Sequence, residues 1–183
     1  MSSISIAGDT SGSISLTVPS VAGTNTVTIP AVTGTVMVSS NMPAFSAYIG
    51  TAQTISSSTY TKMQCNTKEF DTNNCYDSST NYRFTPNVAG YYQVNGEYDN
   101  QAGTPTRMII SVYKNGSEFK RGNDIGLSSG NLGNGAGATV SALVYLNGST
   151  DYIELYAYYT GGGTLAGGNA TQSYFQASII RSA

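Results

Sequence analysis

Two carboxylates, Glu97 and Asp99, are the residues of this sequence that come nearest to a catalytic pair. They stand two positions apart in a segment that alternates as a β-strand does, so both side chains point to one face. Glycoside hydrolysis uses two carboxyl groups in a deep cleft, with the pKa of one of them raised. The same face carries Gln93 and Asn95, which indicates a surface in contact with water. We therefore expect no catalysis from this pair.

The residue types that most other catalytic and metal sites need are missing or wrongly spaced. The sequence has no histidine, which excludes a Ser-His-Asp triad and a histidine general base. Cys65 and Cys75 lie ten positions apart, without the Cys-x-x-Cys spacing of zinc sites; two free thiols and one disulfide both fit this spacing. The turn aspartates do not follow the Asp-x-Asp-x-Asp spacing of calcium loops. We expect a protein that is not an enzyme and holds no metal or cofactor.

Tyr156, Tyr158 and Tyr159 are the residues whose chemistry best suits ligand binding. They lead into a Gly-rich stretch, residues 161–170, which the composition predicts to be a long loop, as it does for residues 122–137. Long loops on a rigid scaffold often bind ligands, and an exposed tyrosine ring can pack on a sugar. The three tyrosines are therefore candidate glycan contacts; burial in the core or in a subunit interface is the alternative.

Composition narrows the range of partners. Charged residues make up 10% of the chain and the net charge is −2. The basic residues are scattered, so no stripe follows a phosphate backbone and we expect no nucleic-acid partner. No apolar run reaches the roughly 18 residues of a membrane span, so we expect no membrane insertion. The first residues lack a basic region and an apolar core, so we expect no secretory signal and synthesis in the cytoplasm.

The first forty residues differ from the rest, because they contain no Tyr, Phe, Lys or Arg and repeat with a period of eleven residues. Gly12, Gly23 and Gly34 begin three units, of which the third is truncated, and Pro19 aligns with Pro30. Each unit alternates Ser or Thr with apolar residues, which predicts a short strand. Such a unit is too short to bury a core, so we expect it to stack on neighbouring copies or on other chains.

The repeats resemble the Gly-Thr-rich repeats of phage tail-fibre and other virion proteins over residues 10–38. The resemblance implies an arm, residues 1–41, that attaches the chain to a particle or forms a short β-stalk. A flexible low-complexity leader is the alternative interpretation. The candidate attachment residues are Leu16, Val18, Pro19, Val27, Ile29 and Pro30.

From residue 44 onward, short alternating segments follow one another with turn residues between them and no helical periodicity. Eight to ten strands at this spacing predict an antiparallel sandwich or jelly roll. Asn115-Gly116 and Asn147-Gly148 predict two tight hairpins. The expected strands are 45–49, 59–65, 82–84, 90–98, 108–113, 140–146, 152–159 and 173–180.

Two of these strands, Met108–Tyr113 and Val140–Leu146, are largely apolar on both faces. A strand of an antiparallel sandwich normally turns one polar face to water. We therefore expect the outer face of both strands to be covered, either by a long loop or by another subunit. Cover by another subunit is the more economical interpretation, and it predicts an oligomer.

The segment Arg83–Tyr98 contains Phe84, five further residues, Gly90 and an aromatic-rich strand. This pattern resembles the central signature of C1q/TNF-like jelly-roll domains, and the likeness extends over residues 42–183. It implies an antiparallel jelly-roll head that assembles as a homotrimer and acts by binding. Val94 and Gly96 replace aromatic residues of the animal proteins, which suits a bacterial or viral relative.

Together these features predict a phage virion structural protein that is made in the host cytoplasm and carried on the particle. Residues 1–41 would be the arm that binds other virion proteins, and residues 42–183 the trimeric fibre or receptor-binding head. The expected ligand is a glycan of the host surface. Two alternatives stay open: a capsid decoration protein of the same fold, and a secreted, extracellular bacterial adhesin.

Overall fold

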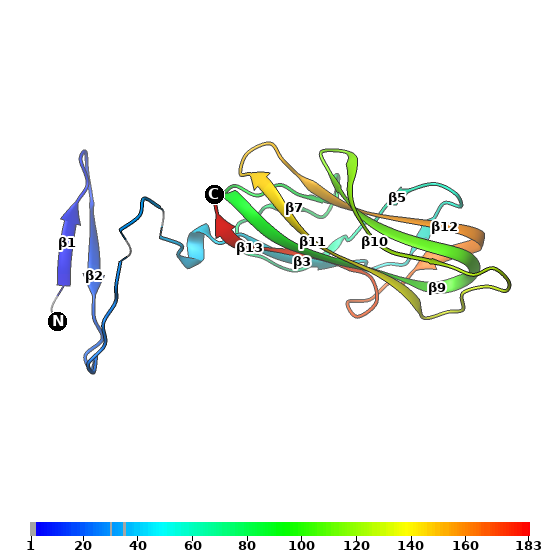
Figure 1. The fold of residues 1–183 in the computed structure, drawn as a ribbon, viewed down its shortest axis with the longest axis horizontal. Coiled ribbons are helices and arrows are strands. Elements are labelled where there is room, and N and C mark those ends of the chain that lie inside the picture. Colours follow the sequence, from blue (N-terminus) through cyan, green and yellow to red (C-terminus); the bar gives the residue numbers. More distant parts are fainter. Residues whose placement is uncertain (1–2, 30, 35) are drawn as a thin grey trace. The chain divides into compact units, whose positions relative to one another are not determined.

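The computed structural model describes residues 3–29, 31–34 and 36–183, and the chain divides into two units, 1–34 and 35–183. The second unit, called the head below, consists of β-strands apart from a short 3-10 helix, η1 (Ser39–Asn41). Its antiparallel jelly roll confirms the predicted fold class (Figure 1). Its strands are β3 (Ala44–Tyr48), β4 (Gln53–Ile55), β5 (Thr61–Lys62), β6 (Thr67–Asp71), β7 (Tyr76–Asp77), β8 (Arg83–Phe84), β9 (Ala89–Lys114), β10 (Ser117–Gly126), β11 (Ala136–Asn147), β12 (Ile153–Ala166) and β13 (Tyr174–Ser182).

The first unit contains one antiparallel hairpin, formed by β1 (Ser3–Ala7) and β2 (Ser13–Thr17). β2 lies in the first eleven-residue repeat, as the alternation predicts. Residues 24–29 and 36–38 of the later repeats form no strand, which differs from the prediction. A strand needs a hydrogen-bonded neighbour, and β1 supplies one only for the first repeat.

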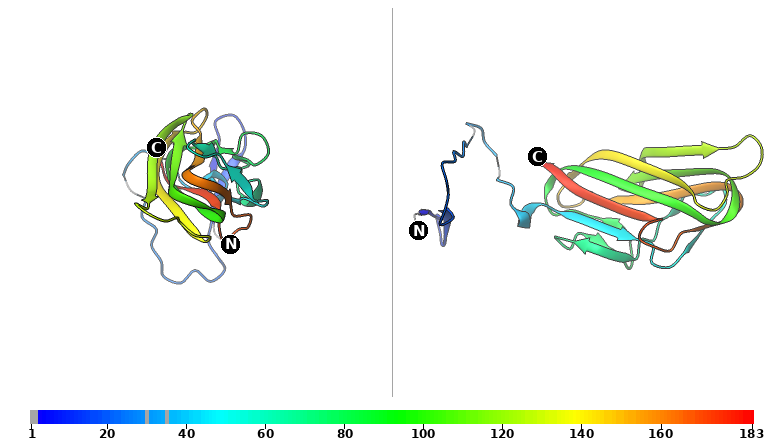
Figure 2. Two further views of the ribbon diagram at one scale, coloured as in Figure 1. Left: turned by 90° about the vertical axis from the view of Figure 1, so that its right-hand side faces the viewer. Right: turned by 90° about the horizontal axis from the view of Figure 1, so that it is seen from below.

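The head has two β-layers that are joined by the 26-residue strand β9. The first half of β9 pairs with β11 on one side and with β13 on the other, and β3 and β6 continue that layer. The second half pairs with β10 and β12, and β4, β5 and β8 pair with the far edge of β12. Figure 2 shows the strands of the head wrapped around a common interior.

Three features of this topology differ from the sequence prediction. The expected strands 90–98 and 108–113 are parts of the single strand β9. Part of each predicted loop is strand, because β10 extends to Gly126 and β12 extends to Ala166. The segment that contains Asn147-Gly148 is not a hairpin turn, since β11 and β12 both pair with β9 and lie in different layers.

The core lies between the two layers and is rich in aromatic rings. Phe45 stacks on Tyr76 and Phe84 with ring centroids 4.4 and 4.7 Å apart, and it meets Phe175 edge-on. Each of these four side chains is at most 3% exposed. Burying such rings supplies much of the stability of a domain of this size.

Two glycines explain parts of the sequence signature. A Cβ on Gly90 would lie 2.4 Å from the carbonyl oxygen of Arg181, so only glycine lets β9 and β13 approach there. Asn115 and Gly116 have φ values of 52° and 80°. These positive angles suit the tight turn that joins β9 to β10, and they confirm the predicted hairpin. Within the residues that the structure describes, no helix is long and apolar enough to cross a membrane.

Candidate functional site

Four tyrosines gather on the outer side of the layer that β12, the second half of β9 and β10 form. Tyr156 and Tyr158 project from β12, Tyr113 from β9, and Tyr60 from the segment that precedes β5. The ring of Tyr113 stacks on Tyr156 with centroids 4.0 Å apart. Tyr60 contacts both Tyr113 and Tyr158, at 5.9 and 5.1 Å. All four side chains are half-buried, and we call them the tyrosine face.

Charged groups border the tyrosine face on the side of β10. Arg121 donates two hydrogen bonds to the Glu118 carboxylate, at 3.0 and 3.1 Å. Glu118 also accepts hydrogen bonds from the hydroxyls of Ser111, at 2.8 Å, and Tyr60, at 3.4 Å. On the side of β5, Lys62 forms an ion pair with Glu154 at 2.5 Å. The rings are therefore bordered by hydrogen-bonding groups of both charge signs.

The surroundings of these groups set their protonation states. Hydrogen bonds from Arg121 hold the pKa of Glu118 below its usual value, so this carboxylate is charged at neutral pH. Burial, followed by the Glu118 charge, raises the pKa of Tyr60 and of Tyr113. Burial and the Glu154 charge do the same for Tyr156. The phenols of Tyr60, Tyr113 and Tyr156 thus remain neutral hydrogen-bonding groups over the physiological range.

The chemistry available here is binding. Aromatic rings beside charged and hydroxyl groups suit a ligand that has both an apolar face and hydroxyls, as a sugar ring does. The described residues contain no group of three or more Cys, Asp or Glu that could hold a metal ion.

Of the three predicted sugar contacts, Tyr156 and Tyr158 are half-buried on the outer side of β12, whereas Tyr159 is buried. Tyr159 is 3% exposed and lies in the core, because it follows Ile153, Leu155 and Ala157 on the inner face of β12. Tyr60 and Tyr113 were not among the candidates. Tyr60 lies within the expected strand 59–65 but precedes the observed strand β5, and only the fold brings its ring to the tyrosine face.

The structure shows what covers the outer face of Met108–Tyr113, the first of the two strands that are apolar on both faces. On the outer side of Met108–Tyr113, Ile109 and Ser111 are 2% and 0% exposed in the single chain. The chain itself covers this strand, with Tyr60 spanning the neighbouring rings. The expectation that another subunit covers Met108–Tyr113 is therefore wrong.

The outer face of Val140–Leu146, the second strand that is apolar on both faces, is exposed in the single chain. On the outer side of β11, Leu143 is 52% exposed and Tyr145 is 42% exposed. Tyr145 pairs with Tyr91 of β9, and the two rings lie 5.5 Å apart. Tyr91 is itself 40% exposed. We call Tyr91, Leu143 and Tyr145 the apolar patch.

The carboxylate pair is not the solvated pair that the sequence predicts. Glu97 is half-buried, whereas Asp99 is only 6% exposed. The segments around Gly135 and Gly167 fold over the end of this part of β9 and bond to the carbonyls of Asn100 and Asp99. Burial raises the pKa of Asp99, and its Oδ1 atom has no hydrogen-bond partner among the described residues.

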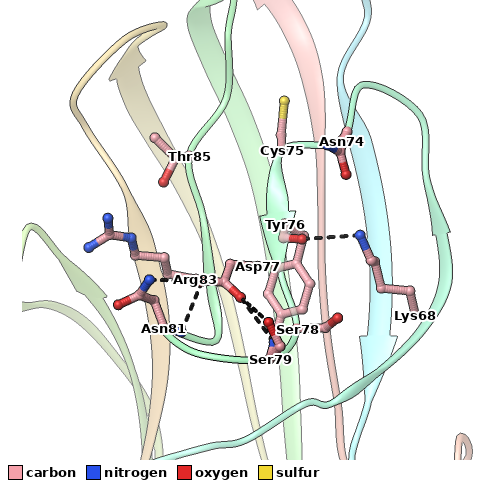
Figure 3. Close-up of a pocket in the computed structure, with 10 residues that line it drawn as sticks. All are labelled: Lys68, Asn74, Cys75, Tyr76, Asp77, Ser78, Ser79, Asn81, Arg83 and Thr85. Carbon is pink, nitrogen blue, oxygen red and sulfur yellow. Dashed lines mark hydrogen bonds between the residues drawn. The ribbon is translucent and has the colours of Figure 1, made fainter.

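An open depression of about 510 Å³ lies beside β6, β7 and β8 (Figure 3). Its polar groups bind one another. The Asp77 carboxylate accepts hydrogen bonds from the backbone N–H groups of Ser79 and Thr80, both at 3.0 Å. The Arg83 guanidinium lies over the ring of Tyr152, 4.3 Å from its centroid. These contacts shape the loop between β7 and β8, which favours a structural role for the depression.

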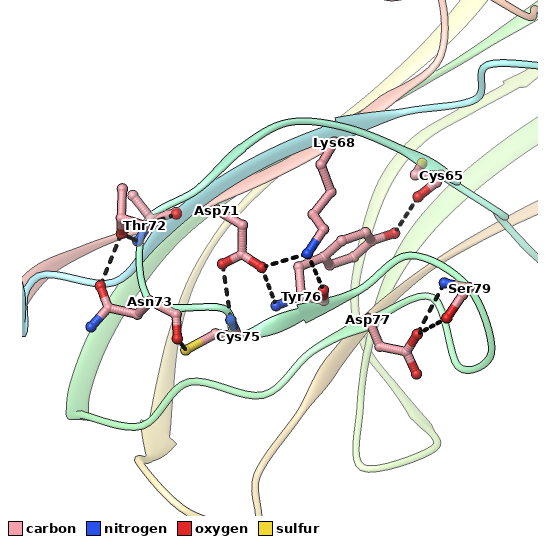
Figure 4. Close-up of polar contacts among 10 residues, drawn as sticks. Cys65, Lys68, Asp71, Thr72, Asn73, Cys75, Tyr76, Asp77 and Ser79 are labelled. Carbon is pink, nitrogen blue, oxygen red and sulfur yellow. Dashed lines mark hydrogen bonds and ion pairs between the residues drawn. The ribbon is translucent and has the colours of Figure 1, made fainter.

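The polar groups around Asp71, next to this depression, also form their hydrogen bonds with other groups of the chain (Figure 4). Asp71 accepts the N–H groups of Cys75 and Tyr76 at 2.9 and 3.0 Å, and Lys68 lies 3.1 Å from the same carboxylate. The Tyr76 hydroxyl donates to the carbonyl oxygen of Cys65 at 3.0 Å. Both cysteines are buried and free.

The predicted attachment residues in the first unit are all exposed where the structure describes them. Leu16 and Val18 are 55% and 50% exposed, and Val27 and Ile29 are 89% and 79% exposed. Pro19 is exposed as well. Pro30 lies outside the described residues.

Comparison with known proteins identifies the fold. No model of a protein family matches the sequence, and no curated protein matches it. Murine APRIL superposes with a TM-score of 0.58 at 8% identity, covering 76% of this chain and 99% of APRIL. The Eiger TNF of S. frugiperda superposes with a TM-score of 0.55 at 10% identity, covering 78% and 93%.

A third structure that superposes is a viral protein. Vertex protein P5 of phage PRD1 has a TM-score of 0.53 at 16% identity, covering 78% of this chain and 98% of P5. At these identities the likeness concerns the fold alone. The head of this chain thus has the jelly-roll fold of TNF-like proteins, which is also the fold of a phage vertex protein.

Proposed function

We propose that this chain is a phage virion protein with a trimeric head, and that the tyrosine face of the head adheres to glycans of the host surface. The observation that carries the binding role is the tyrosine face itself. Four half-buried rings lie between the Glu118–Arg121 and Lys62–Glu154 pairs. Such a surface can hold a sugar ring by stacking and by hydrogen bonds without further rearrangement.

The apolar patch supports the homotrimer. Leu143 and Tyr145 expose about half of their surface on a strand whose other outward residues are polar. Exposed apolar side chains that lie together on a sheet commonly mark a contact with another chain. Three copies arranged around a threefold axis would bury this patch in a closed assembly.

The virion role rests on two observations. The head shares its fold with the PRD1 vertex protein P5. The arm carries eleven-residue repeats, which we propose are of the phage-fibre kind, and its apolar side chains, such as Val27 at 89%, are largely exposed. Side chains of this kind gain stability when a partner covers them, and other virion proteins are the proposed partners of the part of the arm that follows the β1–β2 hairpin.

A capsid position is the second candidate, and the description of P5 as a vertex protein favours it over a tail fibre. In that case the same head would decorate the capsid surface. Antibody labelling of intact particles separates the two locations. Label on the tail supports the fibre, and label confined to the capsid supports the decoration protein. Particles without any label would reject both.

The glycan role is tested with the full-length protein and purified host surface polysaccharide. Tyr158→Ala removes one ring of the tyrosine face and should weaken binding about 2- to 12-fold, the loss expected for one stacking contact of about 0.5–1.5 kcal/mol. Tyr152→Ala is the matched control, since this half-buried tyrosine directly precedes β12, and its ring lies under the Arg83 guanidinium instead of on the tyrosine face. Equal binding by the wild type and Tyr158→Ala would reject the site.

A further inference from the structure

The β1–β2 hairpin has one apolar face and one hydroxyl-rich face. Directly paired residues of an antiparallel hairpin point to the same side. Ile4 pairs with Leu16, and Ile6 pairs with Ile14, so four aliphatic side chains share one face. Each of the four is between 55% and 69% exposed. The opposite face includes the pairs Ser5–Ser15 and Ala7–Ser13.

A hairpin of this size needs more structure around it. An isolated two-stranded hairpin is marginally stable at best in water. Among the described residues, β1 pairs only with β2, so each strand leaves one edge with free backbone hydrogen-bonding groups. Both the apolar face and the two edges therefore require a partner.

The side chains of β1 and β2 indicate which kind of partner would cover the hairpin. Neither strand contains a charged residue, and Asp9 in the turn is the one charge within residues 1–34. Charge complementarity therefore cannot select a partner for the hairpin, which offers only aliphatic side chains, hydroxyl groups and free strand edges. Another copy of the hairpin provides both kinds of contact that this one lacks, an apolar face to cover its apolar face and a free strand edge to pair with each of its free edges.

We propose that the hairpins of three copies of this chain close into a six-stranded ring. A threefold rotation places β1 of one copy beside β2 of the next, and the strands then alternate in direction around the ring. Closure pairs every edge and turns Ile4, Ile6, Ile14 and Leu16 inward, with the Ser and Thr side chains in water. This inference rests on the trimeric head proposed above, which holds three arms together at a high local concentration.

Hydrogen exchange of the full-length protein tests the ring. In the ring, backbone amides of residues 3–17 should exchange at least about 100-fold more slowly than in an unstructured chain. The paired substitutions Ile6→Ser and Ile14→Ser should abolish this protection and leave the head unchanged. Ser5→Thr with Ser15→Thr, on the opposite face, is the matched control and should keep the protection.

The outcomes separate this inference from the proposed function. If the full-length protein is a trimer and residues 3–17 exchange at unstructured rates, the ring is overturned while the trimeric head stands. Protection that arises only when other virion proteins are added would also overturn the ring, because the partner would then be a different protein. A monomeric full-length protein would reject the trimeric head itself.

Discussion

Leu143 provides the sharpest test of where the chains of the trimer meet. Burying a whole leucine side chain stabilises a protein by about 1.5–3 kcal/mol. Because 52% of Leu143 is exposed in the single chain, burial of that part contributes about 1 kcal/mol per protomer. Leu143→Ala should therefore destabilise the trimer by about 3 kcal/mol, which raises its dissociation constant about 150-fold.

The assay is the protein concentration at which half of the chains are assembled, measured by sedimentation over a dilution series. For a trimer this concentration varies as the square root of the dissociation constant, so Leu143→Ala should raise it about tenfold. Leu127→Ala is the matched control, because Leu127 is 43% exposed but lies after β10, away from the patch. An unchanged midpoint for Leu143→Ala, or an equal shift for both variants, would refute the assignment of the interface.

Three further predictions concern the stability and reactivity of the head. Burial raises the pKa of Asp99, so its ionisation opposes folding above the usual aspartate range. Asp99→Asn should therefore raise the melting temperature at pH 7, by an amount that shrinks as the pH falls towards 4; no gain at pH 7 would contradict the burial argument. The hydrogen bonds from Ser79 and Thr80 lower the pKa of Asp77, so they stabilise the fold above pH 4 and are lost as the pH falls further. In urea titrations at pH 7, Asp77→Ala should reduce the unfolding free energy by about 0.5–1.5 kcal/mol, and an unchanged midpoint would count against this role. Burial raises the pKa of Cys65 to about 12, so a thiol reagent at pH 8 should label Cys65 only after denaturant is added; rapid labelling of the native protein would show that the thiol is accessible.

The fold was predictable because its signals are local. Short segments between turn residues predicted strands at 45–49, 140–146 and 173–180, which overlap β3, β11 and β13. The spacing of Phe84 and Gly90 carried the resemblance to the jelly roll. Both residues have a structural reason: Phe84 is fully buried, and Gly90 lies against the backbone of Arg181. The continuity of β9 was not predictable, since Gly103 and Pro105 are residues that usually end a strand.

The candidate site was only partly predictable, because contacts between distant segments create it. Continuing the alternation of Ile153, Leu155 and Ala157 would have placed Tyr159 in the core and Tyr158 outside. Nothing in the sequence around Tyr60 indicates that its ring meets Tyr113 and Tyr158. In the same way, the burial of Asp99 depends on segments that are distant in sequence, so alternation alone suggested contact with water.

The solution mass of the full-length protein, measured by light scattering at micromolar concentration, tests the central claim most directly. A trimeric head predicts three times the chain mass of 19.1 kDa, about 57 kDa. Repeating the measurement on residues 42–183 would show whether the head assembles without the arm. A mass near 19.1 kDa for the full-length protein would mean that the apolar patch is not a subunit interface, and it would contradict the trimeric binding head.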